Sequence, residues 1–469
     1  MSQQAAAGLA PPSLAAPRAS VGARSFAVAS GAAFLAFLDA TVANLAVADL
    51  RGDFAGASVG DATWVVTIYA IAFAALLAPA GRIADVLGRR TLLVAGVGGF
   101  TVFSLACAAA PSLGVLLAAR GLQGAAAALM IPASLAVVLH DTPPERRTAA
   151  IGAWSAAGAL AAAAGPALGG VLVDGFGWRA VFAITVPVGL AVLAAALRMR
   201  GGEGQGGRLA DVLGSAVLGA GVGLAALGIT QASGWGWGDG RTLACLAGAA
   251  LAVAWSLRRS LGHPAPAIET SLWRSRSFAV ANLASLLYGA ALFSSLLVGV
   301  LVLVQVWGYS ELEAGLAVTP GAVAAAIVAL RAAPLVVRFG PRRVVAGGAA
   351  VLGTAFAVTV LTLPEDPAYL AFWLPVGLVM GVGMGALTTG ISSAAALAVE
   401  PARFAAGVGL TQTGRQVGGA LGVAGMATLL ETGEGLGAYT DVYVMCALLA
   451  LAAGLAGLGL AGAPKAARS

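Results

Sequence analysis

Long apolar runs, separated by short charged segments, make up most of this chain. A bilayer core about 30 Å thick is crossed by about 20 helical residues, because each residue of a helix rises about 1.5 Å. The runs are long enough to predict fourteen membrane-spanning helices. The first six are Phe26–Val47, Thr63–Ala80, Thr91–Ala109, Leu113–Leu139, Ala149–Val173 and Ala180–Leu197. Two more are Leu209–Gln231 and Thr242–Leu257, and the last six are Ser277–Val306, Glu313–Val337, Val344–Leu363, Ala368–Ala398, Ala405–Leu430 and Ala438–Gly462.

Polar linkers divide these helices into groups of six, two and six. The linker Arg198–Arg208 is rich in glycine, and the linker Arg258–Arg276 contains two prolines near His263. The first residues of the chain lack an apolar core, so we do not expect a signal peptide. We expect a cytoplasmic tail (1–25), an N-terminal six-helix bundle (26–198), two extra helices with their linkers (199–276), a C-terminal six-helix bundle (277–462) and a second tail (463–469).

The distribution of cations supports this topology. With the N-terminus inside and the helices alternating, 20 of the 26 lysines and arginines fall on the inner side. The outer segments hold Arg51, Arg179 and Arg241, and the helices hold Arg120, Arg331 and Arg415. Because inner loops of membrane proteins are enriched in cations, we expect both termini in the cytoplasm.

The composition excludes an ordinary soluble protein. Hydrophobic residues make up 59% of the chain and charged residues only 10%, whereas soluble domains carry about 25% charged residues. The chain is therefore predicted to be an all-α polytopic membrane protein in contact with lipid, with no nucleic-acid partner. Its three cysteines lie inside apolar runs and its two histidines are isolated, so we expect neither disulfides nor a metal.

A charged segment between the second and third helices, Gly81–Arg90, carries the most specific pattern in the chain. It could simply be a solvated hairpin with positive-inside anchors. That interpretation does not explain the spacing of Gly81, Asp85, Gly88 and Arg89, which resembles the loop signature of the major facilitator superfamily. From its place among Arg82, Arg89 and Arg90, we expect Asp85 to help latch the cytoplasmic side, and we expect Gly81, Gly88 and Arg89 to take part in the same gate.

The same pattern returns weakly in the second half of the chain. Pro334–Arg343 lies in the corresponding loop of the last six helices and keeps the glycine and arginines, but Val337 stands where Asp85 would align. Repeated halves of this kind are typical of transporters whose two bundles rock about a central site.

Asp39 is the only acidic residue that the sequence places deep inside a predicted helix. It could be a protonated carboxyl, or one hydrogen-bonded to Thr41. Because ionisable groups are costly in a membrane, a functional role is the better interpretation. The surrounding Leu38–Ala46 also resembles the first-helix motif of fourteen-span drug–proton antiporters, although that family usually has proline where Ala48 stands. The resemblance implies proton coupling at Asp39, and Asn44 of the same motif is a candidate cavity residue.

Arg120 lies in the fourth helix, within Ala119–Gly124. At about 10 Å from the outer end it could extend its side chain outward to water. The segment is similar to the family's fourth-helix Arg…Gln-Gly motif, which implies that Arg120 assists proton transfer. Gln123 and, in the second helix, Tyr69 are further candidates for the cavity wall.

Glycines of the fifth helix form a flat surface for close packing. Gly165, Gly169 and the preceding Gly158 share one helical face, and Pro166 removes a backbone hydrogen bond. An ordinary small-residue interface would look similar. The run Gly165–Gly170, however, resembles the superfamily's antiporter motif, despite Ala161 standing where another glycine is common. The resemblance implies a gating role for Gly165, Pro166, Gly169 and Gly170.

In the thirteenth helix, Gln412 and Arg415 lie on one polar face and are predicted to line the cavity. No Gly-x-x-x-x-Gly-Lys-Ser/Thr loop is present, so an ion gradient rather than ATP is the expected energy source. We therefore expect a major facilitator fold with fourteen helices and no cofactor, a monomer in a bacterial cytoplasmic membrane. Its expected act is proton-coupled export of a small amphipathic or cationic molecule such as an antibiotic. The alternatives are a transporter of a metabolite, peptide or siderophore, or, more remotely, a membrane enzyme or sensor.

Overall fold

The computed structural model describes residues 18–43, 50, 53–54, 59–199 and 211–461, and all the regular structure within these ranges is helical. The helices of the first half are α1 (Arg18–Val42), α3 (Val59–Leu87), α4 (Arg89–Ala108), α5 (Leu113–Asp141), α6 (Arg147–Phe176), α7 (Trp178–Ala183) and α8 (Thr185–Leu197). They are followed by α9 (Val212–Trp235), α10 (Gly240–Gly262), α11 (Arg276–Leu301), α12 (Glu311–Thr362), α13 (Leu374–Leu397), α14 (Phe404–Thr432) and α15 (Gly435–Gly457).

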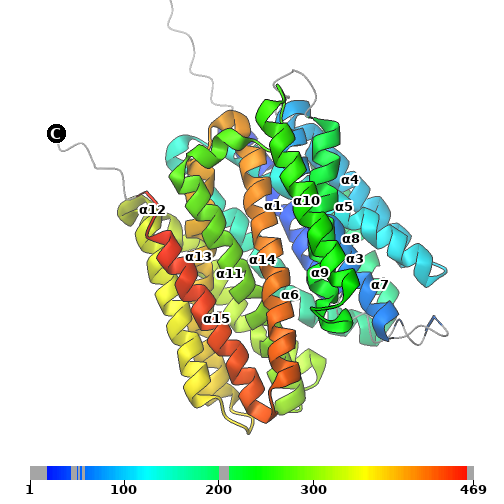
Figure 1. Ribbon diagram of the computed structural model, residues 1–469, viewed down its shortest axis with the longest axis vertical. Coiled ribbons are helices and arrows are strands. Elements are labelled where there is room, and N and C mark those ends of the chain that lie inside the picture. Colours follow the sequence, from blue (N-terminus) through cyan, green and yellow to red (C-terminus); the bar gives the residue numbers. More distant parts are fainter. Residues whose placement is uncertain (1–17, 44–49, 51–52, 55–58, 200–210, 462–469) are drawn as a thin grey trace, which may run out of the picture.

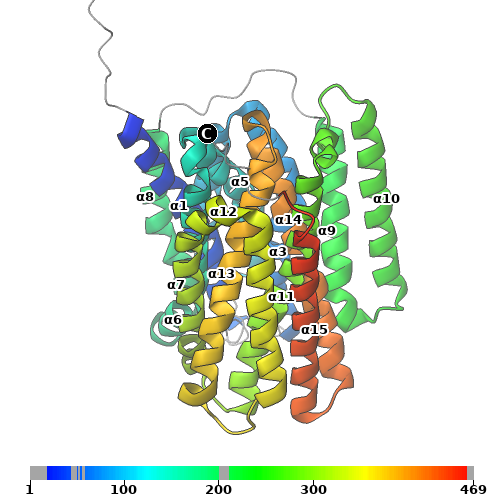
Figure 2. The same cartoon turned by 90° about the vertical axis from the view of Figure 1, so that its left-hand side faces the viewer.

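Two groups of helices lie side by side (Figure 1). We call α1 and α3–α8 the N-terminal bundle and α11–α15 the C-terminal bundle. The N-terminal end of α1 and the C-terminal end of α15 lie at the same end of the molecule in both views (Figures 1 and 2). The two bundles meet mainly where α6 packs on α12 and where α3 packs on α14.

Twelve of the described helical segments are long and apolar enough to cross a membrane. The predicted number of fourteen is therefore not confirmed by length and composition. Two features account for the difference. First, α12 is counted once although it runs through 52 residues and is broken at Gly340, whose φ of 80° is not helical. Second, α14 is not among the twelve, because Arg415 and two glutamines interrupt its apolar surface.

The two extra helices, α9 and α10, stand at one side of the molecule, with α10 outermost (Figure 2). α9 packs on one helix from each bundle. Its Leu218 and Val222 cluster with Ala74 of α3 and with Val417 of α14. Through α9, this pair of helices therefore packs over the α3–α14 contact.

The segment Gly81–Arg90 is more helical than predicted. α3 continues to Leu87, and the chain turns at Gly88 alone, whose φ of 108° requires glycine. The repeated segment turns in the same way, because Gly340 aligns with Gly88 and also has a positive φ. The predicted similarity between the two halves is thus confirmed in the backbone at this position.

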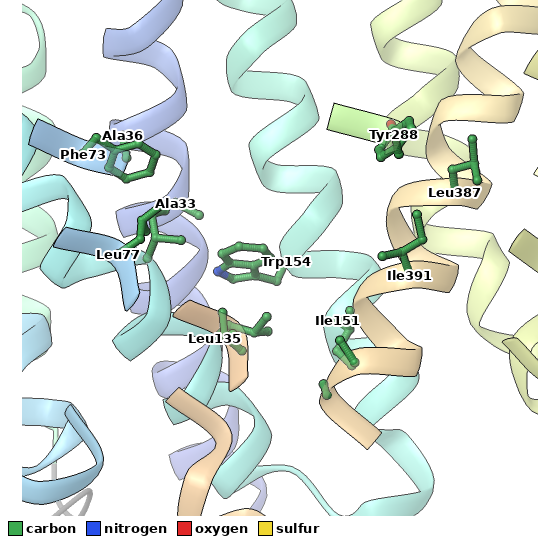
Figure 3. Packing of buried hydrophobic residues seen from close by; sticks show 14 of the residues in the cluster. Ala33, Ala36, Phe73, Leu77, Leu135, Ile151, Trp154, Tyr288, Leu387 and Ile391 are labelled. Atoms are coloured by element: carbon green, nitrogen blue, oxygen red, sulfur yellow. The ribbon is translucent and has the colours of Figure 1, made fainter. Parts of the chain in front are cut away.

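Buried apolar side chains fill the space between the bundles (Figure 3). Trp154 of α6 lies between Leu77 of the N-terminal bundle and Ile391 of the C-terminal bundle, and all three are at least 97% buried. Further apolar residues from both bundles belong to the same cluster, including Phe73, Leu135, Ile151, Tyr288 and Leu387. The core is therefore continuous across the two bundles.

Candidate functional site

A fully buried ion pair lies inside the N-terminal bundle. Arg120 of α5 donates from Nη1 to Oδ2 of Asp39 in α1 over 2.6 Å, and neither side chain is exposed. The alternative in which Arg120 extends outward to water is therefore wrong, because its guanidinium points inward. Removing one partner of a buried pair leaves an uncompensated charge and typically costs about 3–5 kcal/mol.

Gln123, one turn after Arg120, joins both members of this pair. Its amide Nε2 donates to Asp39 Oδ1 over 2.9 Å and to Ser104 Oγ over 2.7 Å. Its Oε1 accepts from Arg120 Nη1 over 2.7 Å. Asp39 thus receives one charged and one neutral hydrogen bond. The sequence singled out all three of Asp39, Arg120 and Gln123, and the structure brings them together.

Aromatic rings and a backbone carbonyl hold the guanidinium in place. The Arg120 Cζ atom lies 4.3 Å from the ring centre of Tyr69 and 5.3 Å from that of Phe182. Arg120 Nε donates to the carbonyl oxygen of Val65 over 3.0 Å. Such cation–π contacts stabilise a desolvated cation. Tyr69 therefore contacts the ion pair directly, and its hydroxyl donates to the carbonyl oxygen of Ala36 over 3.2 Å.

Asp85 connects the two bundles. Its Oδ2 accepts from the backbone N–H of Ala406 over 2.8 Å and its Oδ1 from that of Ala405 over 3.2 Å, at the first turn of α14. A carboxylate is favourable there because the first N–H groups of a helix are unpaired and carry partial positive charge. Arg89 also donates to Asp85 Oδ1, over 3.2 Å, and to the carbonyl oxygen of Pro401. Both contacts join α3 and the turn after it to the C-terminal bundle.

Glycine allows this close approach between α3 and α14. A Cβ atom on Gly81 would lie 2.3 Å from the carbonyl oxygen of Ala405, which is closer than real Cβ contacts. Gly409 faces Leu77 in the same way, where a Cβ would lie 2.5 Å from a backbone oxygen. No side chain larger than hydrogen fits at either position without moving the helices apart.

The linker after α10 adds a residue that sequence analysis missed. Glu269 lies between an arginine of each bundle: its carboxylate is 3.8 Å from Arg82 Nη1 and 3.4 Å from Arg403 Nη1. Arg82 also donates to the carbonyl oxygen of Pro266 over 3.2 Å. An acid in a polar linker carries no signal of its own, so only its neighbours in space identify Glu269 as a part of this contact.

The glycines of α6 pack against both bundles. A Cβ on Gly165 would meet the Thr41 side chain of α1, 2.6 Å from its Cβ, and one on Gly158 would lie 2.9 Å from the Phe37 ring. Gly170 instead approaches Leu312 at the start of α12. Gly169 is buried in the same stretch. The side chain of Pro166 and the whole of Asn44 lie outside the described residues.

A second buried arginine lies in the C-terminal bundle. Arg415 of α14 is 9% exposed, and its Cζ lies 5.7 Å from the ring centre of Tyr288 in α11. Its Nη2 donates to Ser392 Oγ over 3.4 Å. Gln412 is 7% exposed and lies one turn before Arg415, on the same face of α14.

Two carboxylates outside the membrane-spanning segments, those of Asp53 and Asp211, are paired with arginines. The hydrogen bond from Trp178 and, second, that from Arg179 hold the pKa of Asp53 below its usual value. A hydrogen bond from the Arg259 side chain lowers the pKa of Asp211 in the same way, at the start of α9. Both carboxylates therefore stay charged near neutral pH.

The family model described as "Major Facilitator Superfamily" matches residues 29–423 and 281–468. The chain is 34% identical over 410 residues to a "Probable actinorhodin transporter" of Streptomyces coelicolor, covering 85% of this chain and 71% of that one. It is 35% identical over 441 residues to the "Cephamycin export protein CmcT" of Amycolatopsis lactamdurans, covering 91% and 90%. It is 32% identical over 402 residues to the "Multidrug resistance protein Stp" of Mycobacterium tuberculosis, covering 85% and 74%.

Solved structures share the fold. The human organic anion transporter MFSD10 superposes with a TM-score of 0.65 at 16% identity, over 94% of this chain and 100% of that one. The transporter FucP in the outward conformation superposes with a TM-score of 0.62 at 13% identity, over 92% and 97%. At these identities the likeness concerns the fold alone.

Proposed function

Because the chain belongs to the major facilitator superfamily, we propose that it exports a drug, an antibiotic or another small molecule in exchange for protons. The observation that carries the proposal is the fully buried cluster of Asp39, Arg120 and Gln123. Similarity to a cephamycin export protein and to a probable actinorhodin transporter supports export of an antibiotic. It favours transport over catalysis.

In this proposal Asp39 is the proton carrier. While its carboxylate is ionised, Arg120 and Gln123 stabilise the charge, as in the arrangement described here. Protonation removes that charge and leaves Arg120 without its anion. A conformation in which Arg120 and Asp39 separate is then favoured, so proton binding shifts the balance between two states. Substrate that binds the ionised state better competes with the proton, which is the requirement for exchange.

Asp85 and its neighbours act as the cytoplasmic gate. Opening that side requires α3 and α14 to separate, which breaks the bonds from Asp85 to Ala405 and Ala406. We propose that Gly81, Gly88 and Arg89 shape this gate between α3 and α14. We also propose that Gly165, Pro166, Gly169 and Gly170 seal the other contact between the bundles, which α6 makes. The close approaches of Gly81 to Ala405 and of Gly170 to Leu312 support these roles.

We also propose that the chain crosses the membrane fourteen times. The break at Gly340 divides α12 into halves of 311–339 and 341–362, each long enough to cross the bilayer. α14 spans 29 residues and packs between α11 and α3, so it crosses despite its polar face. Together with the remaining helices these give six, two and six crossings, with both termini in the cytoplasm of a bacterium and the protein acting as a monomer.

The direct test is export in an efflux-deficient bacterial strain. Expression of the wild-type chain should lower accumulation of ethidium or of an anionic dye and raise resistance to at least one antibiotic. A protonophore should abolish the difference, because it collapses the proton gradient. Accumulation that is unchanged by expression across a broad compound panel, or export that survives the protonophore, would contradict proton-coupled export.

A further inference from the structure

Arg415 is a buried cation without an acidic partner in the described part of the chain. Its side chain makes no ion pair there, and its Nε atom has no hydrogen-bond partner. Its one hydrogen bond to the described residues, to Ser392 Oγ, is long at 3.4 Å. The carbonyls of its own helix are occupied by the helical ladder. The guanidinium therefore has several donors available to a further group.

The other buried arginines contrast with it. Arg120 faces Asp39, and Arg89 faces Asp85, so each of these charges is compensated. Burying an unpaired charge is costly, and proteins usually pair such a charge or bring it to water. The ring of Tyr288 at 5.7 Å compensates only part of the charge of Arg415. An anionic ligand would supply the missing compensation.

The surroundings of Arg415 are amphipathic. Its neighbour Tyr288 contributes to the apolar cluster between the bundles, opposite Phe73 of the N-terminal bundle (Figure 3). On the polar side, Gln412 lies one turn away along α14, and Ser392 comes from α13 directly after Ile391. A ligand that places an acidic group on Arg415 therefore meets aromatic and aliphatic surface with the rest of its body.

We propose that Arg415 is the anion subsite of the transport site, so that the preferred substrates are amphipathic molecules with a carboxylate, sulfonate or similar acidic group. The proposal rests on the proposed export function and narrows its substrate class away from cations. A guanidinium suits this task because its fork of donors matches the two oxygens of a carboxylate. Tyr288 holds the guanidinium from one side, and its hydroxyl is fixed by Thr388 over 2.8 Å.

The charge of the substrate determines how strongly transport depends on the membrane potential. When one monoanion leaves the cell and one proton enters, two positive charges move inward in net terms. Exchange of a neutral molecule moves one charge, and exchange of a monocation moves none. Transport of an anion should therefore respond to the membrane potential more strongly than transport of a cation does.

The test compares two probes that differ by one sulfonate group: 1-anilinonaphthalene-8-sulfonate, which is an anion, and N-phenyl-1-naphthylamine, its neutral parent. Binding to purified wild type, Arg415→Gln and Arg415→Lys is measured by ligand-induced thermal stabilisation. Arg415→Gln should weaken binding of the sulfonate about tenfold or more, since a hydrogen bond to a charged group contributes about 1.5–3 kcal/mol. Binding of the neutral probe should change less than about twofold. Arg415→Lys should fall between wild type and Arg415→Gln for the sulfonate.

Transport of the sulfonate and of ethidium, a cation, is measured in parallel in proteoliposomes with a lumen-positive potassium diffusion potential. The potential should accelerate uptake of the sulfonate but not of ethidium. Equal weakening of both naphthalene probes by Arg415→Gln, or unchanged binding of the sulfonate, would overturn the subsite. So would wild type that moves ethidium under a pH gradient but neither binds nor moves the sulfonate, and this result would leave the export function intact. If wild type moves no dye while Arg415→Gln still weakens sulfonate binding selectively, the export function fails and the subsite stands.

Discussion

Arg120 and Asp39 compensate each other's charge in a place that water does not reach. We expect Arg120→Gln to lower the thermal stability of the purified protein, because Asp39 is left buried without a cation. The loss should be of the order of 3–5 kcal/mol expected for breaking a buried pair. The double variant Asp39→Asn/Arg120→Gln should regain most of this stability, since both charges are gone, yet export nothing. Thermal unfolding of the two variants in detergent measures the difference, and equal destabilisation would contradict charge compensation.

The sequence alone identified the buried charged residues but not the contacts that they make. Asp39, Arg120 and Arg415 are conspicuous because charge is rare in apolar runs. The hydrogen bonds of Gln123 to both members of the pair depend on how α1 and α5 are rotated against each other, which no local pattern determines. Glu269 could not be identified from the sequence, because acidic residues are common in polar linkers.

Close contacts between helices in this molecule depend mainly on glycine. Gly165→Ala places a Cβ 2.6 Å from the Cβ of Thr41, so α1 and α6 must separate. We expect a loss of stability of about 1–3 kcal/mol and reduced export. Gly175→Ala, near the end of the same helix, is the matched control, because nothing lies within 4 Å of its Cβ. Export and thermal unfolding are measured for both variants. Equal export and equal stability of the two would contradict a close-packing role for Gly165.

Two substitutions test the contact between α3 and α14. Asp85→Asn weakens the bonds to the first turn of α14, and Glu269→Gln removes the charge between Arg82 and Arg403. Both variants should reach the membrane in near-normal amounts but export more slowly, with Asp85→Asn the more impaired because it is more deeply buried.

Glu145→Gln is the control for this contact, since Glu145 is exposed and makes no ion pair within the described residues. Immunoblots of membranes together with dye efflux separate abundance from activity. Full export by Asp85→Asn would show that the hydrogen bonds of Asp85 to the first turn of α14 are not required for transport.

The whole molecule is the scale at which hydrophobic pattern predicts best. Runs of apolar residues place the helices well, and the cation distribution orders them, because both follow from the physics of the bilayer. Pattern fails where a helix changes direction without a polar gap. α7 and α8 meet at Ile184 within one predicted helix, whereas the break of α12 at Gly340 falls in the polar segment between two predicted helices. The break at Ile184 depends on tertiary packing.

Cysteine labelling tests the proposed fourteen crossings. In a background with Cys107, Cys245 and Cys446 replaced, single cysteines at Gly236 and Glu434 should react with an impermeant maleimide added from outside. A cysteine at Pro341 or Arg403 should react only after the membrane is opened. Labelling of Arg403→Cys from outside would mean that α14 does not cross, and labelling of Pro341→Cys would mean that the two halves of α12 do not.

Coupling of export to protons at Asp39 is the central claim, and transport by purified protein in proteoliposomes tests it most directly. Wild type and Asp39→Asn are compared under an imposed pH gradient, with whichever of ethidium and anilinonaphthalene sulfonate the wild type concentrates. Asparagine leaves Arg120 without its anion, so the variant should be less stable than wild type. It keeps an acceptor oxygen for Arg120 and mimics the protonated acid, so it should still fold and bind the probe. It should not concentrate the probe against its gradient. If Asp39→Asn accumulates the probe as wild type does, Asp39 is not the coupling site.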